Sequence, residues 1–300
     1  MGHGLDESTT TVNATLRTVR DYGRMVRFSH SIFALPFALA SAAFASLSAP
    51  VGARQIAWIL VAMVSARNAA MGFNRLADAA IDARNPRTAG REIPRGVLRR
   101  SEVALFVAAL SAIFVLAAGM LNRACLALSP LALLIVFLYS YTKRFTWASQ
   151  FFLGLALAVA PVGAWIAIKA AVEWPPVLLG GSVLLWVAGF DIIYSLQDID
   201  FDRKERLGSI PARFGPGPSL AIARGLHAGS VLLLAAVYPL LPLHPIYLAG
   251  VATVAAILVY EHTLVRADDL SKVNVAFFTT NGLVSVVYFL VAAGSAALGR

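Results

Sequence analysis

Charged residues are scarce in this sequence: 14% of its 300 residues are Asp, Glu, Lys or Arg, whereas 59% are hydrophobic. Soluble globular chains carry about 25% charged residues. One protein core could not bury this much apolar surface, so the shortage of charge excludes an ordinary soluble domain. We therefore predict an all-α, polytopic membrane protein for which the lipid bilayer acts as solvent.

Cysteine is nearly absent as well. Cys125 is the only one, which excludes an internal disulfide. His30 and His262 stand alone in the sequence, so a zinc site of clustered histidine and cysteine is also excluded. The first twenty residues contain no apolar run, and we expect no signal peptide there. We expect a single domain over residues 1–300, in which residues 1–15 form a loose tail.

Apolar segments of membrane-spanning length recur along the whole chain. A bilayer core about 30 Å thick requires a helix of about 20 apolar residues. No long polar stretch divides these segments into two groups, so we predict one bundle of nine transmembrane helices with a pseudo-repeat. The predicted spans are 28–48, 56–78, 102–121, 124–142, 149–171, 177–197, 217–240, 244–262 and 273–297.

Lysine and arginine are distributed unevenly between the two sides of this bundle. The N-terminal tail and the loops after the even-numbered spans hold 18 of the 25, whereas the opposite side holds four. Loops rich in Lys and Arg face the cytoplasm. We therefore expect the inner (cytoplasmic) membrane, with the N-terminus and the long loops cytoplasmic and the C-terminus outside. Because the basic residues lie between apolar spans, the net charge of +9 does not indicate a nucleic-acid partner.

Two acidic segments lie at the cytoplasmic ends of predicted spans two and six. In the first, Asn74, Asp78 and Asp82 are spaced four residues apart, which places three oxygen-bearing side chains on one helix face. In the second, Asp198 and Asp202 repeat the same spacing. One such segment is as compatible with a solvated helix end as with a site. Two of them on the same side of the membrane predict a shared site.

The chemistry of these segments indicates magnesium and diphosphate. Stacked carboxylates at a membrane boundary repel one another and are costly to desolvate, so they require a positive partner. Hard oxygen ligands suit Mg²⁺, which completes its shell with water and phosphate oxygens. The loop orientation explains most of the Arg and Lys residues nearby, but they are also what a diphosphate requires. A diphosphate beside an apolar cavity indicates a lipid diphosphate.

These residues resemble the UbiA superfamily of intramembrane aromatic prenyltransferases. The likeness rests on NRLADAAID (74–82) and DIDFD (198–202), and it covers nearly the whole chain. The forms AMGFNR and SIPARFG are most similar to the 4-hydroxybenzoate polyprenyltransferase-like branch, which serves ubiquinone and menaquinone biosynthesis. Gly90 and Arg95 depart from some relatives, and neither is a ligand position. Further matching segments are FALPFALA (33–40), NPRTAGREIPRG (85–96), YSYTKRFT (139–146) and FFTTNG (277–282).

The resemblance implies a nine-helix fold, two Mg²⁺ ions, a polyprenyl diphosphate donor and an aromatic acid acceptor such as 4-hydroxybenzoate or 1,4-dihydroxy-6-naphthoate. The activity it implies is Mg²⁺-dependent polyprenyl transfer, with Asp78 and Asp198 essential to it. The implied metal ligands are Asn74, Asp78, Asp82, Asp198 and Asp202. The implied diphosphate-binding residues are Lys143, Arg75, Arg27 and Tyr139.

Three residues outside the ligand set are further candidates. Asp191 lies about two turns inside span six, where an ionisable group is a functional candidate. We assign it a catalytic role, although pairing with a buried cation such as Arg67 explains it equally well. Arg67 lies on the face of Asn74 and is suited to hold the carboxylate of an aromatic acid. Tyr194, on the face of Asp191, is assigned to the acceptor as well.

Other classes of function remain open from the sequence. A secondary transporter also has repeats and intramembrane acids, but its sites usually lie at the midplane of the bilayer. A non-catalytic assembly factor would leave the paired acidic segments unexplained. A related prenyltransferase that acts on another ring, such as a haem or chlorophyll precursor, differs only in its acceptor pocket.

Overall fold

The computed structural model describes residues 21–23, 25 and 33–299, and over this part of the chain the regular structure is helical throughout. Residues 266 and 269 form one isolated bridge. The long helices are α2 (Leu35–Ala45), α3 (Ala53–Arg84), α4 (Arg100–Leu121), α5 (Arg123–Thr142), α6 (Ser149–Lys169), α7 (Trp174–Ser195), α10 (Pro216–Val237), α11 (Ile246–Leu264) and α12 (Asn281–Leu298). The short elements used below are η2 (Leu196–Asp198), α8 (Ile199–Lys204), α9 (Ile210–Phe214) and the π-helix η4 (Val275–Thr280).

The prediction of an all-α polytopic membrane protein is confirmed. Eight helices in the described part of the chain are long and apolar enough to cross a membrane. They correspond to predicted spans two to nine. Predicted span one, 28–48, contains the shorter helix α2, and its residues 28–32 lie outside the described residues. The count of nine full spans is therefore not confirmed, and eight described helices have the length and composition of a span.

The turn between α4 and α5 is as tight as its sequence requires. Asn122 is the only residue between the two helices, and its side-chain oxygen accepts a hydrogen bond from the backbone N–H of Cys125 at 2.8 Å. Such a bond satisfies one of the N–H groups left free at a helix start. The Asn122 amide also donates to the carbonyl of Ile166 at 2.8 Å, which joins this turn to the end of α6.

Helix α7 lies at the centre of the bundle and packs against both α6 and α10. Its contact with α6 is close enough to require glycine, because a Cβ on Gly154 would lie 2.3 Å from the carbonyl oxygen of Leu184. Large aromatic side chains fill the core beside α7, among them Phe37, Trp186 and Tyr288. This packing makes α7 a rigid support for the second acidic segment, which follows it.

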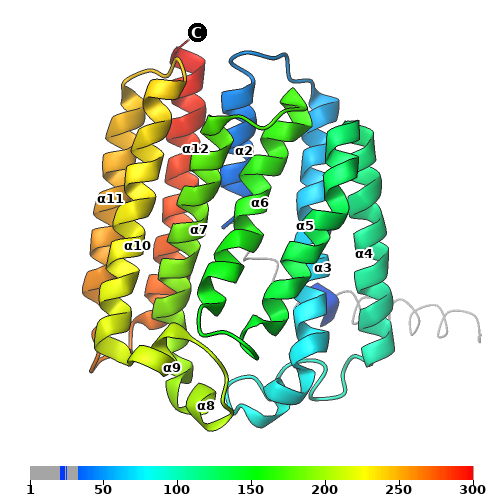
Figure 1. Cartoon of the computed structure of the whole chain (residues 1–300), viewed down its shortest axis with the longest axis vertical. Helices are drawn as coiled ribbons and strands as arrows, with labels where there is room; N and C mark the ends of the chain where they lie inside the picture. Colours follow the sequence, from blue (N-terminus) through cyan, green and yellow to red (C-terminus); the bar gives the residue numbers. More distant parts are fainter. Residues whose placement is uncertain (1–20, 24, 26–32, 300) are drawn as a thin grey trace, which may run out of the picture.

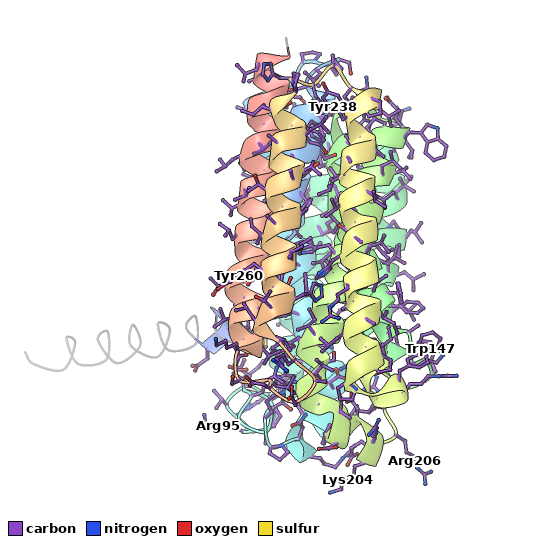
Figure 2. The ribbon with its side chains drawn as sticks, turned by 90° about the vertical axis from the view of Figure 1, so that its left-hand side faces the viewer. Arg95, Trp147, Lys204, Arg206, Tyr238 and Tyr260 are labelled. Carbon is purple, nitrogen blue, oxygen red and sulfur yellow. The ribbon has the colours of Figure 1, made fainter. Side chains whose placement is uncertain are left out.

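The two acidic segments meet at one end of the bundle. Figure 1 shows the loop after α3 at the same end as α8 and α9, while the C-terminus lies at the opposite end. Figure 2 shows Arg95, Lys204 and Arg206 at the end that carries α8, and Tyr238 at the other. The acids that the sequence placed about 120 residues apart, at 78 and 198, thus share one end with the basic loops.

Candidate metal and diphosphate site

The first acidic segment lies on one continuous helix. Helix α3 extends to Arg84, beyond the predicted end at residue 78, so Asn74, Asp78 and Asp82 all belong to it. The Asn74 amide donates to the Asp78 carboxylate at 2.9 Å, as expected for side chains four residues apart on one face. The predicted stacking of amide and carboxylate oxygens is confirmed for this pair.

The second acidic segment is not a regular continuation of its helix. Helix α7 ends at Ser195, the chain tightens into the 3₁₀ turn η2, and α8 follows. Asp198 ends η2 and Asp202 lies in α8, and both are buried. The Ser209 hydroxyl donates to Asp202 Oδ2 at 2.8 Å. The regular helix that the spacing of these acids implied is therefore interrupted by a 3₁₀ turn between Ser195 and Ile199.

Lys143 joins the two acidic segments. It follows α5, and its ammonium group lies in the electrostatic field of Asp202, Asp191, Asp198 and Asp78. Burial alone would lower the pKa of Lys143, but the four carboxylates outweigh it and hold this pKa above its usual value. The lysine therefore remains positive at neutral pH. Acids from both segments act on one cation, so the fold brings the two segments into a single site.

Two arginines of the loop after α3 bind acidic side chains directly. Arg87 forms a bidentate pair with Asp198, and its Nε donates to Oδ1 at 2.9 Å. Nη1 of Arg91 donates to both oxygens of Asp82, at 2.7 Å each. Burial would lower the pKa of Arg87, but its hydrogen bond and charge interaction with Asp198 raise it. From the sequence, these arginines were attributed mainly to the orientation of the loops in the membrane. Their acidic partners were not predicted.

Arg144 neutralises the remaining acid of the first segment. Its Nη2 donates to Asp78 Oδ1 at 3.0 Å and to the carbonyl oxygen of Ala77 at 2.7 Å. The guanidinium lies 4.7 Å from the ring centroid of Tyr141. Each of the three acids Asp78, Asp82 and Asp198 therefore has an arginine of its own.

Tyr194 lies beside Arg87, the arginine that binds Asp198. Its hydroxyl accepts a hydrogen bond from Arg87 Nη1 at 3.2 Å, and the Arg87 guanidinium lies 5.3 Å from its ring centroid. Its ring also packs against Phe277, with ring centroids 4.1 Å apart. A role in acceptor binding stays a prediction for Tyr194.

The remaining predicted residues extend the site into the bundle. Tyr139 lies within electrostatic reach of Asp78, Arg75 and Asp191, and Arg67 lies within reach of Tyr139. Arg75 is buried, and its Nε donates to the Met25 carbonyl at 3.4 Å. Their proposed contacts with diphosphate and acceptor stay predictions. Arg27, also assigned to the diphosphate, lies outside the described residues.

The donor set suits a metal that shares its ligands with a substrate. In the described part of the chain, no group of three His, Cys, Asp or Glu is gathered closely enough to hold a metal ion by itself. Mg²⁺ does not require such a group, since it binds through one or two carboxylates and takes its other ligands from water and phosphate. The acids near Lys143 therefore fit a magnesium–diphosphate complex better than a bare ion.

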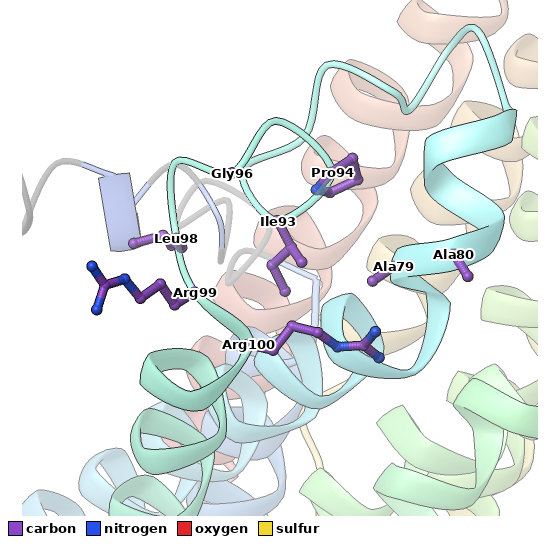
Figure 3. Close-up of a pocket in the computed structure, with 8 residues that line it drawn as sticks. All are labelled: Ala79, Ala80, Ile93, Pro94, Gly96, Leu98, Arg99 and Arg100. Carbon is purple, nitrogen blue, oxygen red and sulfur yellow. The ribbon is translucent and has the colours of Figure 1, made fainter.

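A pocket of about 360 Å³ lies beside this site, between the end of α3 and the start of α4. Figure 3 shows Ile93 and Pro94 on the loop beside the turn of α3 that carries Ala79 and Ala80, and the Arg100 side chain directed toward that helix. None of the predicted metal or diphosphate ligands lines it. It is a feature of the outer side of the α3–α4 loop.

A buried polar network supports the aromatic wall near Tyr194. Asn281 accepts a hydrogen bond from the Trp186 indole at 2.6 Å and donates to Glu261 at 2.8 Å. His262 is not isolated as expected, because its Nε2 lies 3.0 Å from Nδ1 of His227. These residues come from α7, α10, α11 and α12, and no local spacing could have joined them.

Comparison with known proteins agrees with this geometry. The sequence model of the UbiA prenyltransferase family matches residues 34–283. A 4-hydroxybenzoate octaprenyltransferase of Aeromonas salmonicida is 31% identical over 74% of this chain and 76% of its own. The corresponding protein of Aliivibrio fischeri is 29% identical over 78% of this chain and 81% of its own.

Solved structures show the same arrangement of helices. The apo structure of a UbiA homologue from Aeropyrum pernix superposes with a TM-score of 0.77, at 32% identity, over 90% of this chain and 97% of that one. A UbiA homologue from Archaeoglobus fulgidus bound to GPP and Mg²⁺ has a TM-score of 0.69 at 20% identity, over 92% and 99% of the two chains, and supports the fold. The family match, the relatives and the fold agree, and the chain belongs to the UbiA prenyltransferase family.

Proposed function

We propose that this protein transfers a polyprenyl group from a polyprenyl diphosphate to an aromatic acid in respiratory quinone biosynthesis, with Mg²⁺ as cofactor. The observation that carries the proposal is the position of Lys143 in the field of carboxylates from both acidic segments. A cation among acids at one end of an apolar bundle is suited to a metal–diphosphate headgroup whose tail lies in the membrane. The names of the relatives support the same reaction.

The oxygen ligands for two Mg²⁺ ions would come from both segments. When bound, Mg²⁺ neutralises the diphosphate and makes it a better leaving group. Lys143 would hold the diphosphate oxygens and stabilise the negative charge that collects there as the allylic C–O bond breaks. The proposed ligands are Asn74, Asp78, Asp82, Asp198 and Asp202. Arg27, Arg75 and Tyr139 are proposed to help bind the diphosphate.

The allylic fragment requires a dry and electron-rich surrounding. The rings of Tyr194 and Phe277 pack together beside Arg87, and such an aromatic wall is suited to border a cation that forms next to the diphosphate. Exclusion of water by the bundle protects such a cation from hydrolysis. The electron-rich acceptor ring then attacks it, and a base removes the ring proton.

The names of the relatives and the position of Arg67 support the acceptor assignment. The relatives are named for 4-hydroxybenzoate, and 1,4-dihydroxy-6-naphthoate is the second candidate acid. We propose that Arg67 binds the acceptor carboxylate, since it lies deeper in α3 than the metal ligands and reaches Tyr139 electrostatically. We propose a catalytic role near the ring for Asp191, whose charge acts on Lys143.

The proposed location is the inner membrane, with the site at the cytoplasmic face. The gathering of Arg95, Lys204 and Arg206 at the end that carries α8 supports this orientation. The position of the acidic site at one membrane face also argues against a secondary transporter, whose ion sites usually lie at the midplane.

The test is an assay of membranes with a radiolabelled polyprenyl diphosphate, run in parallel with 4-hydroxybenzoate and 1,4-dihydroxy-6-naphthoate. We expect a prenylated product with one of them, and none after EDTA treatment or in Asp78→Ala and Asp198→Ala variants. Asp200→Ala is the matched control, because Asp200 is an exposed acid of the same segment. Product formation that persists under chelation would refute the proposal. If neither acid is prenylated but another aromatic ring is, only the assignment of the acceptor is refuted.

A further inference from the structure

The acids assigned to the metal are already bound by arginines of the same chain. Arg87 holds both carboxylate oxygens of Asp198, and Arg91 holds both of Asp82. These are the oxygens that a metal ion would need. A metal ion that approached these oxygens would lie beside two guanidinium groups, whose positive charge opposes its binding, so the metal and the arginines compete for the acids.

The arginines cover the acids from the solvent side. The Asp198 and Asp82 side chains are 8% and 7% exposed, whereas those of Arg87 and Arg91 are 33% and 21% exposed. Buried carboxylates without a cation are strongly unfavourable. The two arginines thus neutralise the acids in the absence of metal, and their own exposure gives them room to move outward.

Arg91 also has a donor available for a second partner. Its Nε is buried and makes no hydrogen bond within the described residues. A buried guanidinium N–H without an acceptor is costly. A diphosphate oxygen beside Asp82 would satisfy it, because the guanidinium fork matches phosphate as well as carboxylate.

Only the side chains need to rearrange. The backbone N–H of Arg87 donates to the Asn85 side-chain oxygen at 2.9 Å, and the Thr88 N–H donates to the Asn85 carbonyl at 2.9 Å. The Thr88 hydroxyl donates to the Asp82 carbonyl at 3.1 Å. This turn fixes the loop to the end of α3, so both guanidinium groups can leave their acids while their backbone stays in place.

We propose that Arg87 and Arg91 occupy the metal-binding carboxylates of the empty site and transfer to the diphosphate as it enters with its metal. This rests on the proposed function. A divalent ion alone would add positive charge beside Lys143 and two displaced arginines, which opposes its entry. The diphosphate accepts the displaced arginine donors and supplies oxygens to the metal, so metal and diphosphate bind together and the bare ion binds weakly.

The experiment measures the Mn²⁺ retained by the purified full chain in equilibrium dialysis, with and without inorganic diphosphate, against a protein-free chamber that accounts for Mn²⁺ complexed by diphosphate in solution. The wild type should bind Mn²⁺ tightly only with diphosphate. Arg87→Gln and Arg91→Gln should each bind Mn²⁺ about tenfold more tightly than the wild type without diphosphate, since a charge-assisted competitor is gone. Both variants should bind diphosphate less tightly than the wild type.

Arg84→Gln is the matched control, because Arg84 carries the same charge near the same loop but pairs with Glu205 instead of a proposed ligand. It should behave as the wild type. Arg87→Lys keeps the charge but loses the two-point contact, so its Mn²⁺ affinity should lie between those of the wild type and Arg87→Gln. This variant also serves if Arg87→Gln does not fold.

The outcomes separate this inference from the proposed function. If the variants bind Mn²⁺ no better than the wild type without diphosphate, or if Arg84→Gln tightens equally, the exchange of arginines is refuted while the metal–diphosphate function stands. If the wild type binds no Mn²⁺ even with diphosphate, both are refuted.

Discussion

Gly208 is the position where a single methyl group should disable the site without touching a proposed ligand. It lies between α8 and α9, and its N–H donates to the carbonyl of Lys143 at 2.6 Å. A Cβ at this position would lie 2.2 Å from the carbonyl oxygen of Thr146. The segment that carries the second acidic group and the loop that carries Lys143 therefore touch backbone to backbone.

The size of the effect follows from that distance. Gly208→Ala must separate the two segments by about 0.8 Å to bring the contact from 2.2 Å to 3.0 Å, below which real Cβ atoms are essentially never found. Ser209, the next residue, holds Asp202, so the shift moves this acid relative to Lys143. A misplacement of about 1 Å can cost about 100-fold in rate. We expect kcat/KM to fall by about 100-fold, or about 2.7 kcal/mol of transition-state stabilisation.

The assay is the initial rate of prenyl transfer as a function of prenyl diphosphate concentration. Gly217→Ala is the matched control, because nothing lies within 4 Å of its added Cβ. Thermal unfolding in detergent shows whether each variant remains folded. If folded Gly208→Ala keeps kcat/KM within about threefold of the wild type, the contact does not set the geometry of the site, and the reasoning is refuted.

Three further predictions concern single residues. Asp191→Asn should keep the fold and slow prenyl transfer at saturating substrate, and normal turnover would remove this residue from the mechanism. Lys143→Met should raise the KM for prenyl diphosphate about tenfold or more, since a charged hydrogen bond is lost; an unchanged KM would contradict its assigned role. Asn281→Leu should lower stability by about 1–3 kcal/mol, because Trp186 and Glu261 lose their partner. An unaltered unfolding temperature in detergent would show that these bonds contribute little.

Local patterns were sufficient for much of the architecture. The length and hydropathy of each apolar run predicted the spans, since the thickness of the bilayer sets the length of a helix that crosses it. The spacing of Asn74 and Asp78 predicted a contact that the structure contains, since residues four apart lie on one helix face. The predicted spans 102–121 and 124–142 left room only for a tight turn, and in the structure Asn122 alone separates α4 from α5.

The same patterns did not predict contacts between residues that lie far apart in the sequence. Arg87 binds Asp198, 111 residues away, and the position of Arg91 on Asp82 depends on how a loop folds back over its helix. The change to a 3₁₀ turn before Asp198 is likewise not written in the spacing of the acids.

By itself, the sequence determined the class of protein and the positions of eight of its long apolar helices, and it predicted which acidic residues share a helix face, because helix period and bilayer thickness act on neighbouring residues. Only the tertiary structure decided that Lys143 interacts electrostatically with both acidic segments. It also decided that each of the three acids Asp78, Asp82 and Asp198 pairs with its own arginine. Those pairings depend on how separate helices and loops pack together. The balance of charge in the site is therefore a property of the folded bundle.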